Sequence, residues 1–316
     1  MRLYRTVRAA AIDIGSNSVR LLVADARPGG ALKIIVKEIE TTRIGEGMGC
    51  SGCLSQEAIS RTIGAVTRFC SDAQEQGAER IYAFATAAVR DAANGGAFIA
   101  EMGRQTGLAP HVLSEEEEAL AGFAGADVGD PCGVIDIGGG STELAVGEGR
   151  VPRASVSMRM GAVYLSERYP LGDVADPLGL EAMTQTAQSI LRSDAGPIRE
   201  ALGGAPVQWV GLGGTITSLA AMDLRMAHYD RERIQGHALS RETVGRWRDR
   251  LARTRAAERA AIPGLAPERA DIILAGVVIL DAFFAHFGIG ALRVSDRDNL
   301  EGYLLMRVEQ EFGAKP

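Results

Sequence analysis

Two acidic residues flank a run of three glycines near the middle of the chain. Asp136 lies in one apolar run and Glu143 directly precedes the next, with the turn 138–142 between them. Apolar runs joined by a short glycine-rich turn are typical of a β-hairpin. Glycines let backbone N–H groups close around phosphate oxygens, and neighbouring hydroxyls add further donors. The residues that we expect to bind phosphate here are Gly138, Gly139, Gly140, Ser141 and Thr142.

Carboxylates on both sides of a phosphate site would repel the ligand unless a divalent cation lay between them. We therefore predict that Asp136 and Glu143 help to hold Mg²⁺, or Mn²⁺ in its place, together with the substrate. The alternative is a glycine-rich hairpin with ordinary surface acids, since one such turn is a weak signal.

The same pattern occurs a second time, near the N-terminus. Residues 12–23 match residues 135–146 at seven of twelve positions, with a constant offset of 123. The copy places Asp13 where the later hairpin has Asp136, so we predict Asp13 as a further metal-site acid. The residues of the second predicted phosphate turn are Gly15, Ser16, Asn17 and Ser18.

A duplicated hairpin implies two homologous domains. This layout resembles the actin, Hsp70 and sugar-kinase superfamily, an α/β fold of two actin-like (ribonuclease H-like) domains with a phosphate-binding cleft between them. We expect the first domain over residues 1–124 and the second over 125–316, with a last helix that can pack back on the first domain.

Four consecutive glutamates open a predicted helix after a short strand. Ser114 and Glu117 stand in the register of a capping box, so Glu117 has a structural role. Glu115 and Glu116 suit the positive end of the helix dipole.

Of the four glutamates, Glu118 alone has no structural role in this interpretation, so it is the candidate for catalysis. A carboxylate there could orient or deprotonate a water that attacks phosphorus. Ala121 and Gly122 follow one turn later on the same face, where small residues would leave room for a ligand. The alternative is a row of four solvated glutamates.

Two further segments could bind phosphate. A predicted strand over 81–85 delivers Thr86 and, one helical turn later, Arg90, a hydroxyl and a guanidinium on one side of a helix start. The alternative is an N-cap threonine with a surface arginine. A predicted strand over 207–210 leads into Gly213, Gly214 and Thr215, where backbone amides could meet a phosphate or a nucleoside, or form a plain glycine turn.

The composition, 46% hydrophobic and 23% charged over 316 residues, predicts a globular protein with room for two domains. A net charge of −6 gives no general reason to bind nucleic acid or membrane. The apolar run 9–12 is too short for a signal peptide, and the run 272–287 is too short to span a bilayer and reads as a buried helix. We therefore expect a cytoplasmic protein. Cys50 and Cys53 lack a second ligand pair at zinc spacing.

Taken together, these segments resemble the Ppx/GppA family of exopolyphosphatases and guanosine pentaphosphate phosphohydrolases. The resemblance implies that Glu118 activates water, that Arg90 and the two turns hold phosphoryl oxygens, and that the acids of the hairpins serve the metal and phosphate site. We place Glu117 and Arg90 beside Glu118 in the catalytic set. The segments that carry the resemblance are 13–18, 85–90, 114–119, 136–143, 160–163, 211–215, 263–265 and 269–271.

One segment departs from the family pattern. Where the family commonly reads Ser-(Asp/Glu)-Gly-x-Leu-Arg-Glu-Gly, residues 295–302 read Ser-Asp-Arg-Asp-Asn-Leu-Glu-Gly. Arg297 thus replaces glycine and Leu300 replaces arginine, so an anion contact made by that arginine is lost or moved to Arg297. The chain resembles the short, two-domain members.

The predicted function is metal-dependent hydrolysis of a terminal phosphoanhydride, with inorganic polyphosphate as the leading substrate. Removal of the 5′-terminal phosphate of guanosine pentaphosphate requires the same chemistry and stays open. A protein of another class, a sensor that binds an alarmone or ATP without turnover, is also compatible with the superfamily. Members of the family often pair, so the resemblance implies a homodimer.

Overall fold

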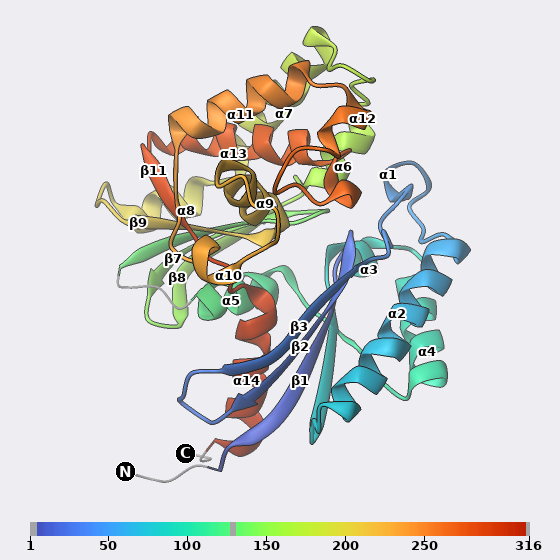
Figure 1. The fold of residues 1–316 in the computed structure, drawn as a ribbon. Coiled ribbons are helices and arrows are strands. Elements are labelled where there is room, and N and C mark those ends of the chain that lie inside the picture. Colours follow the sequence, from blue (N-terminus) through green and yellow to red (C-terminus); the bar gives the residue numbers. More distant parts are fainter. Residues whose placement is uncertain (1–4, 127–130, 314–316) are drawn as a thin grey trace. The chain divides into compact units, whose positions relative to one another are not determined.

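The computed structural model describes residues 5–126 and 131–313. The chain forms two compact units, each with its own sheet (Figure 1). Unit 1 comprises Met1–Gly125 and Asn299–Pro316, and unit 2 comprises Ala126–Asp298. The last helix of the chain therefore belongs to unit 1.

Unit 1 is built on a five-stranded sheet in the order β3-β2-β1-β4-β5. The first three strands are antiparallel neighbours, and β4 and β5 run parallel to β1. Figure 1 shows α2 and α4 side by side on one face of this sheet, and α14 on the other. The elements are β1 (Val7–Ile14), β2 (Ser18–Ala26), β3 (Lys33–Thr41), α1 (Met48–Ser51), α2 (Gln56–Glu75), β4 (Arg80–Ala85), α3 (Ala87–Asp91), α4 (Gly95–Thr106), β5 (His111–Val112), α5 (Glu115–Ala126) and α14 (Asn299–Phe312).

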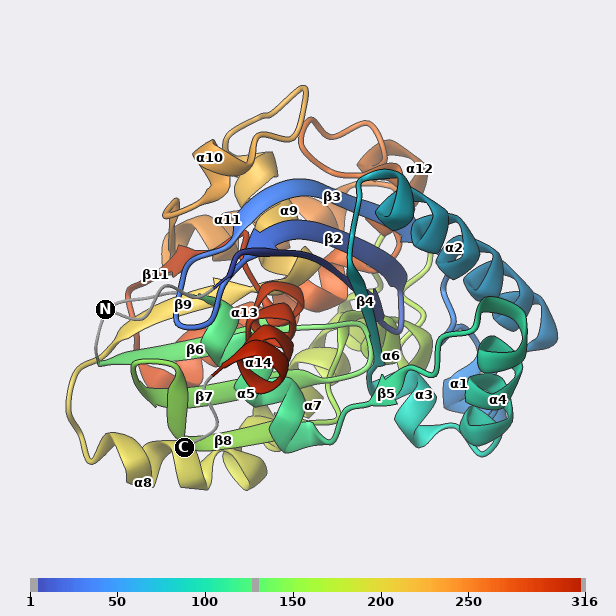
Figure 2. The same cartoon turned by 90° about the horizontal axis from the view of Figure 1, so that it is seen from below.

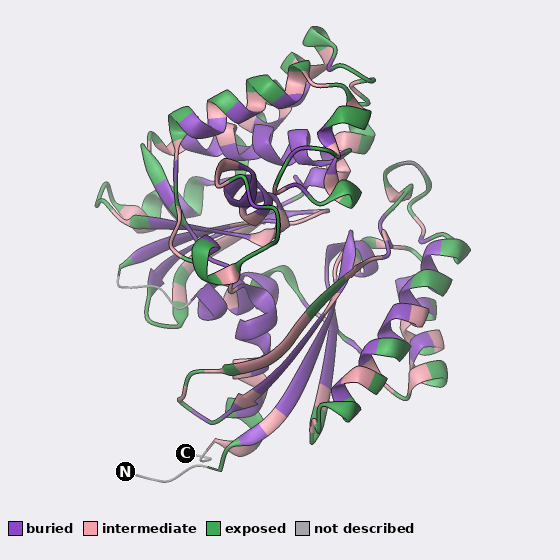
Figure 3. Cartoon of the chain, in the orientation of Figure 1, coloured by how far each residue is buried: buried purple, intermediate pink, exposed green. Residues whose placement is uncertain are grey.

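Alternation along β1 decides which way the first predicted acid points. Ala10, Ile12 and Ile14 pack against α2 and α4, whereas the intervening residues pack on the face covered by α5 and α14. The strand is buried on both faces (Figure 3). Asp13 therefore lies on the α5 and α14 face, and α5 carries Glu118.

Close packing of these two helices explains the small residues after Glu118. Ala121 is fully buried, and a methyl group added at Gly302 of α14 would overlap the carbonyl group of Ala121. The expectation that Ala121 leaves room for a ligand is wrong, because its small size serves the approach of α14. Leu300 is also fully buried in this core.

Unit 2 is built on a six-stranded sheet in the order β10-β11-β9-β6-β7-β8. Strands β6, β7 and β8 are antiparallel neighbours (Figure 2), and β9 and β11 continue the sheet in parallel with β6. The elements are β6 (Cys132–Ile137), β7 (Thr142–Glu148), β8 (Val151–Met158), α6 (Ala162–Arg168), α7 (Pro177–Asp194), α8 (Gly196–Leu202), β9 (Gln208–Leu212), α9 (Gly213–Asp223), α10 (Arg231–Ile234), β10 (Ala238–Ser240), α11 (Arg241–Arg253), α12 (Ala256–Arg259), a 3₁₀ turn (Pro267–Arg269), α13 (Ile273–Phe287) and β11 (Ala291–Val294).

The two sheets share one topology, which confirms the duplication. The order β3-β2-β1-β4-β5 in unit 1 corresponds to β8-β7-β6-β9-β11 in unit 2. The repeated segments form the hairpins β1–β2 and β6–β7, as their glycine turns predict.

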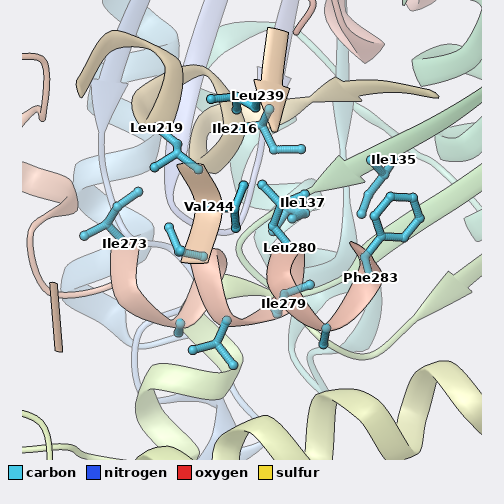
Figure 4. Packing of buried hydrophobic residues seen from close by; sticks show 14 of the residues in the cluster. Ile135, Ile137, Ile216, Leu219, Leu239, Val244, Ile273, Ile279, Leu280 and Phe283 are labelled. Atoms are coloured by element: carbon cyan, nitrogen blue, oxygen red, sulfur yellow. The ribbon is translucent and has the colours of Figure 1, made fainter. Parts of the chain in front are cut away.

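The apolar segment predicted as a buried helix forms α13 at the centre of unit 2. Its Ile279, Leu280 and Phe283 pack with Ile135 and Ile137 of β6 (Figure 4). No helix in the described ranges is long and apolar enough to cross a membrane.

Candidate active site

The acid of the first hairpin is held by an arginine from the same hairpin. Asp13 lies directly opposite Arg20 in the β1–β2 pair, and Arg20 Nε donates to Asp13 Oδ2 at 2.8 Å. Directly opposed residues of antiparallel strands point to the same face of the sheet. Arg20 Nη2 also donates to Asn299 Oδ1, at 2.6 Å. The charge of Asp13 is thus compensated within unit 1.

The proposed catalytic glutamate is buried and forms an ion pair. Glu118 is 8% exposed, and its Oε2 accepts from Arg90 Nη1 at 2.9 Å. Arg90 also donates to the carbonyl oxygen of Leu113, at 3.0 Å. The alternative of four solvated glutamates is therefore wrong for Glu118, and the partly buried Arg90 is no surface arginine.

Burial sets the protonation of this carboxyl group. Burial, as the largest cause, and the charges of Asp13 and Glu115 raise the pKa of Glu118, whereas Arg90 lowers it; the net result is a rise from 4.5 to about 7. A carboxylate with a pKa near 7 has the basicity that a general base needs at neutral pH.

The neighbouring glutamate has a different partner. Ser114 N donates to Glu117 Oε2 at 2.9 Å and Glu117 N donates to Ser114 Oγ at 3.1 Å, which confirms the predicted capping box. His111 Nε2 lies 3.5 Å from the same Oε2 atom of Glu117. Glu118 thus pairs with Arg90, whereas Glu117 caps the start of α5.

Thr86 lies at the start of α3, where its carbonyl oxygen accepts from Arg90 N at 3.1 Å. Its buried hydroxyl makes no capping hydrogen bond to α3 within the described part of the chain. Thr86 is thus the N-cap residue of α3, as the alternative had it, but its hydroxyl group is not used for capping. It stays a predicted phosphate ligand.

The glycine turn of unit 2 has its carbonyl groups fixed by the helix that follows. The carbonyl oxygens of Gly138 and Gly139 accept from the N–H groups of Ala162 and Val163, both at 2.9 Å. In a planar trans peptide the N–H group points opposite to the carbonyl group. The N–H groups of Gly139 and Gly140 therefore point away from α6, as an anion site requires.

Unit 1 repeats this arrangement with a different segment. The carbonyl oxygens of Ser16 and Asn17 accept from Gly45 N and Arg43 N, each at 2.9 Å. The N–H groups of Asn17 and Ser18 consequently point away from residues 43–45. Asn17 Nδ2 donates to Ser18 Oγ at 3.1 Å, whereas Asn17 Oδ1 is buried and finds no hydrogen-bond partner among the described residues. Buried polar atoms of this kind are usually satisfied by water or ligand.

The acids of unit 2 form a polar row with a serine. Asp136 lies directly opposite Glu143, which in turn lies opposite Ser157 of β8. Ser157 Oγ donates to Glu143 Oε1 at 2.8 Å and so fixes that carboxylate. The hydroxyl group of Thr142 donates to the carbonyl group of Met160. Any phosphate contact of Thr142 would therefore come from its N–H group.

The third glycine segment forms the start of α9. A methyl group at Gly213 would overlap the carboxylate of Asp136, and one at Gly214 would overlap the guanidinium of Arg269. The side chain of Thr215 packs against Gly276 of α13, so only its backbone is available to a phosphate. The start of α9 is thus flanked by an acid and an arginine.

The three predicted metal ligands are divided between the units. Asp136 and Glu143 form the acid pair of unit 2, and Asp13 is paired with Arg20 in unit 1. The described residues contain no cluster of three or more His, Cys, Asp or Glu side chains that could hold a metal ion by themselves. Two oxygen ligands from the protein suit Mg²⁺, which usually keeps several waters and substrate oxygens.

The sequence model of the Ppx/GppA phosphatase family matches residues 22–311. The chain belongs to this family. Exopolyphosphatase 2 of Mycobacterium tuberculosis is 35% identical over 319 aligned residues, which cover 94% of this chain and 98% of that protein. As a Ppx/GppA phosphatase, the chain is a phosphoanhydride hydrolase.

Solved structures of similar chains agree with the fold. A Ppx/GppA enzyme of Aquifex aeolicus is 31% identical, with 96% of this chain and 100% of that chain covered and a TM-score of 0.79. An exopolyphosphatase from Cytophaga hutchinsonii is 24% identical, with 97% and 100% covered and a TM-score of 0.85, and it shows the fold alone. The predicted architecture of two duplicated actin-like domains is confirmed.

Sequence reasoning missed four polar residues of this Ppx/GppA chain, namely Arg20, Ser157, Arg269 and Asn299. The register of the first hairpin contained a signal for Arg20, because it stands opposite Asp13 as Glu143 stands opposite Asp136. Arg269 lies in a segment that carried the family resemblance. Of the cysteine pair, Cys53 is a free thiol, and the side chain of Cys50 lies outside the described residues.

Proposed function

We propose that this chain is an exopolyphosphatase that removes the terminal phosphate of inorganic polyphosphate with a water activated by Glu118. The observation that carries the proposal is the buried carboxylate of Glu118 on Arg90, with a pKa of about 7. The name of its Mycobacterium tuberculosis relative supports the substrate.

In the proposed reaction, the carboxylate of Glu118 accepts a proton from the water that attacks the terminal phosphorus. The bond from this phosphorus to the bridging oxygen breaks, and the shortened polyphosphate leaves with that oxygen while the terminal group is released as phosphate. Arg90 keeps enough of this buried group ionised at neutral pH, since its positive charge opposes the effect of burial. Each hairpin turn would bind phosphoryl oxygens through its outward N–H groups, which are those of Asn17 and Ser18 in unit 1 and those of Gly139 and Gly140 in unit 2. No covalent intermediate is required.

We propose Asp136 and Glu143 as the protein ligands of a divalent cation, Mg²⁺ or Mn²⁺. When bound, the cation would offset the negative charge of the phosphoryl oxygens. Ser157 would hold Glu143 in one orientation for this purpose. Asp13, also predicted as a metal ligand, is paired with Arg20, and its role at the metal stays a prediction.

The test measures phosphate release from long-chain polyphosphate and, separately, from guanosine pentaphosphate, with Mg²⁺ or with a chelator. Glu118→Gln should lower the rate by about a hundredfold or more, as the loss of a general base does. Glu116→Gln is the matched control, because Glu116 is exposed in the same turn of α5.

The substrate cut faster by the wild type decides between polyphosphate and guanosine pentaphosphate. Full activity of Glu118→Gln would overturn the role of Glu118. A wild type that cuts neither substrate but binds nucleotide tightly would favour the non-catalytic sensor.

A further inference from the structure

Asn299, the first residue of unit 1 after unit 2, contacts the arginine that pairs with Asp13. Asn299 begins α14, is 6% exposed, and accepts through Oδ1 from Arg20 Nη2 at 2.6 Å. Arg20 at the same time donates through Nε to Asp13 Oδ2, at 2.8 Å. The guanidinium group of Arg20 is thus fixed from two sides.

We propose that Asn299 is a positioning residue for the hydrolysis, which holds Arg20 against Asp13 so that the charge of Asp13 stays compensated near Glu118. The proposal rests on the proposed function, because it assigns a consequence to the protonation of Glu118. Asn299 has no direct role in the chemistry, and it acts through Arg20.

The electrostatic surroundings of Glu118 explain why this position matters. Arg90 from α3 favours the carboxylate form, whereas Asp13 from β1 and Glu115 from α5 itself disfavour it. Charges interact more strongly in a buried site than in water. If Arg20 moves away from Asp13, the charge of Asp13 acts on Glu118 with less compensation, and less Glu118 is ionised at neutral pH.

The two residues that follow Asn299 in α14 have other surroundings. The side chain of Leu300 is fully buried in the apolar core of unit 1. Glu301, 2% exposed, binds Lys37 of β3 at 2.8 Å. In the family pattern the corresponding dipeptide is Leu-Arg, so this chain has its polar side chain one position earlier, where it meets Arg20.

The test is the pH dependence of polyphosphate hydrolysis in Asn299→Leu, which keeps the approximate size of the side chain and removes the acceptor oxygen. We expect the acidic limb of the kcat profile to move to higher pH by about half to one unit. At pH 6 the rate should then fall by about three- to tenfold, and at pH 9 it should stay within about twofold of the wild type.

Glu301→Gln is the matched control, because it removes the negative charge from another buried ion pair, that with Lys37, in the same turn of α14. This variant should lower thermal stability and leave the acidic limb in place. If Asn299→Leu lowers the rate by one factor at every pH, or leaves the profile unchanged, the positioning role is overturned.

A second measurement separates this inference from the proposed function. Carbon-13 NMR of the Glu118 carboxyl group follows its titration without turnover, in wild type and in Asn299→Leu. A shifted titration with no hydrolysis of polyphosphate would refute the proposed function and keep the link between Asn299 and Glu118. An unshifted titration would refute the link, whatever the activity.

Discussion

Replacing Glu118 by glutamine should stabilise the protein at alkaline pH while it removes the proposed base. Two opposing influences act on this side chain, since burial disfavours its charge and Arg90 favours it. The net result is a pKa raised from 4.5 to about 7, with burial as the largest cause. Glutamine retains the shape and the hydrogen-bonding oxygen but never has to be charged in the interior.

The sign of the effect follows from proton binding in the two states. Between pH 4.5 and 7 the folded protein holds a proton on Glu118 that the unfolded chain has released. Stability therefore falls as the pH rises through this window. A difference of about 2.5 units at about 1.4 kcal/mol per unit gives roughly 3 kcal/mol, reached above pH 7. The free energy of unfolding of Glu118→Gln should lack this decline.

Urea unfolding at a series of pH values between 5 and 8.5 measures the difference between the two proteins. Both tryptophans, Trp209 and Trp247, lie in unit 2, so circular dichroism is needed to follow unit 1. Glu116→Gln should run parallel to the wild type, because Glu116 is exposed. A wild type that instead loses stability towards acid, relative to Glu118→Gln, would mean that Arg90 outweighs burial and that the reasoning is wrong.

Three further outcomes are expected. The rate of polyphosphate hydrolysis should rise with pH through a midpoint near 7 as Glu118 loses its proton, and a midpoint near 4.5 would contradict the role of burial. Ser157→Ala should raise the Mg²⁺ concentration needed for half-maximal activity by about tenfold, because Glu143, the proposed metal ligand, loses the hydroxyl group that orients it. An unchanged Mg²⁺ titration would argue against Glu143 as a ligand. Gly213→Ala should lower both activity and melting temperature, because an alanine at a φ of 84° destabilises the fold by about 1–3 kcal/mol and its methyl group displaces Asp136. Gly236→Ala, at a φ of 80° with open space around it, should lower the melting temperature alone.

The hairpins and their turns could be predicted because local sequence encodes them. The glycine turn, the alternation of side chains and the fixed offset of 123 residues place Asp13 and Asp136 without knowledge of the rest of the chain. The capping box of Ser114 and Glu117 is local for the same reason, since both partners lie within one helical turn.

The remaining contacts join residues far apart in sequence, where local patterns carry no information. Arg20 and Asn299 are 279 positions apart, and the contact depends on how α14 packs on β1 and β2. Ala121 was misjudged for a similar reason, because the helix that needs its small size begins at Asn299. Burial of Glu118 could not be predicted from a run of four glutamates, since the run fixes their spacing but not which face the sheet covers.

One of the differences between the duplicated hairpins fits the proposed division of the chemistry between the units. The offset of 123 residues sets Arg20 of unit 1 against Glu143 of unit 2, each directly opposite the repeated aspartate. A guanidinium beside Asp13 partly offsets its negative charge, which would favour ionisation of Glu118, the proposed base. A second carboxylate beside Asp136 does the reverse, because it concentrates negative charge and suits a cation. One exchange in a duplicated scaffold would thus suit the proposed base in unit 1 and the proposed metal ligands in unit 2.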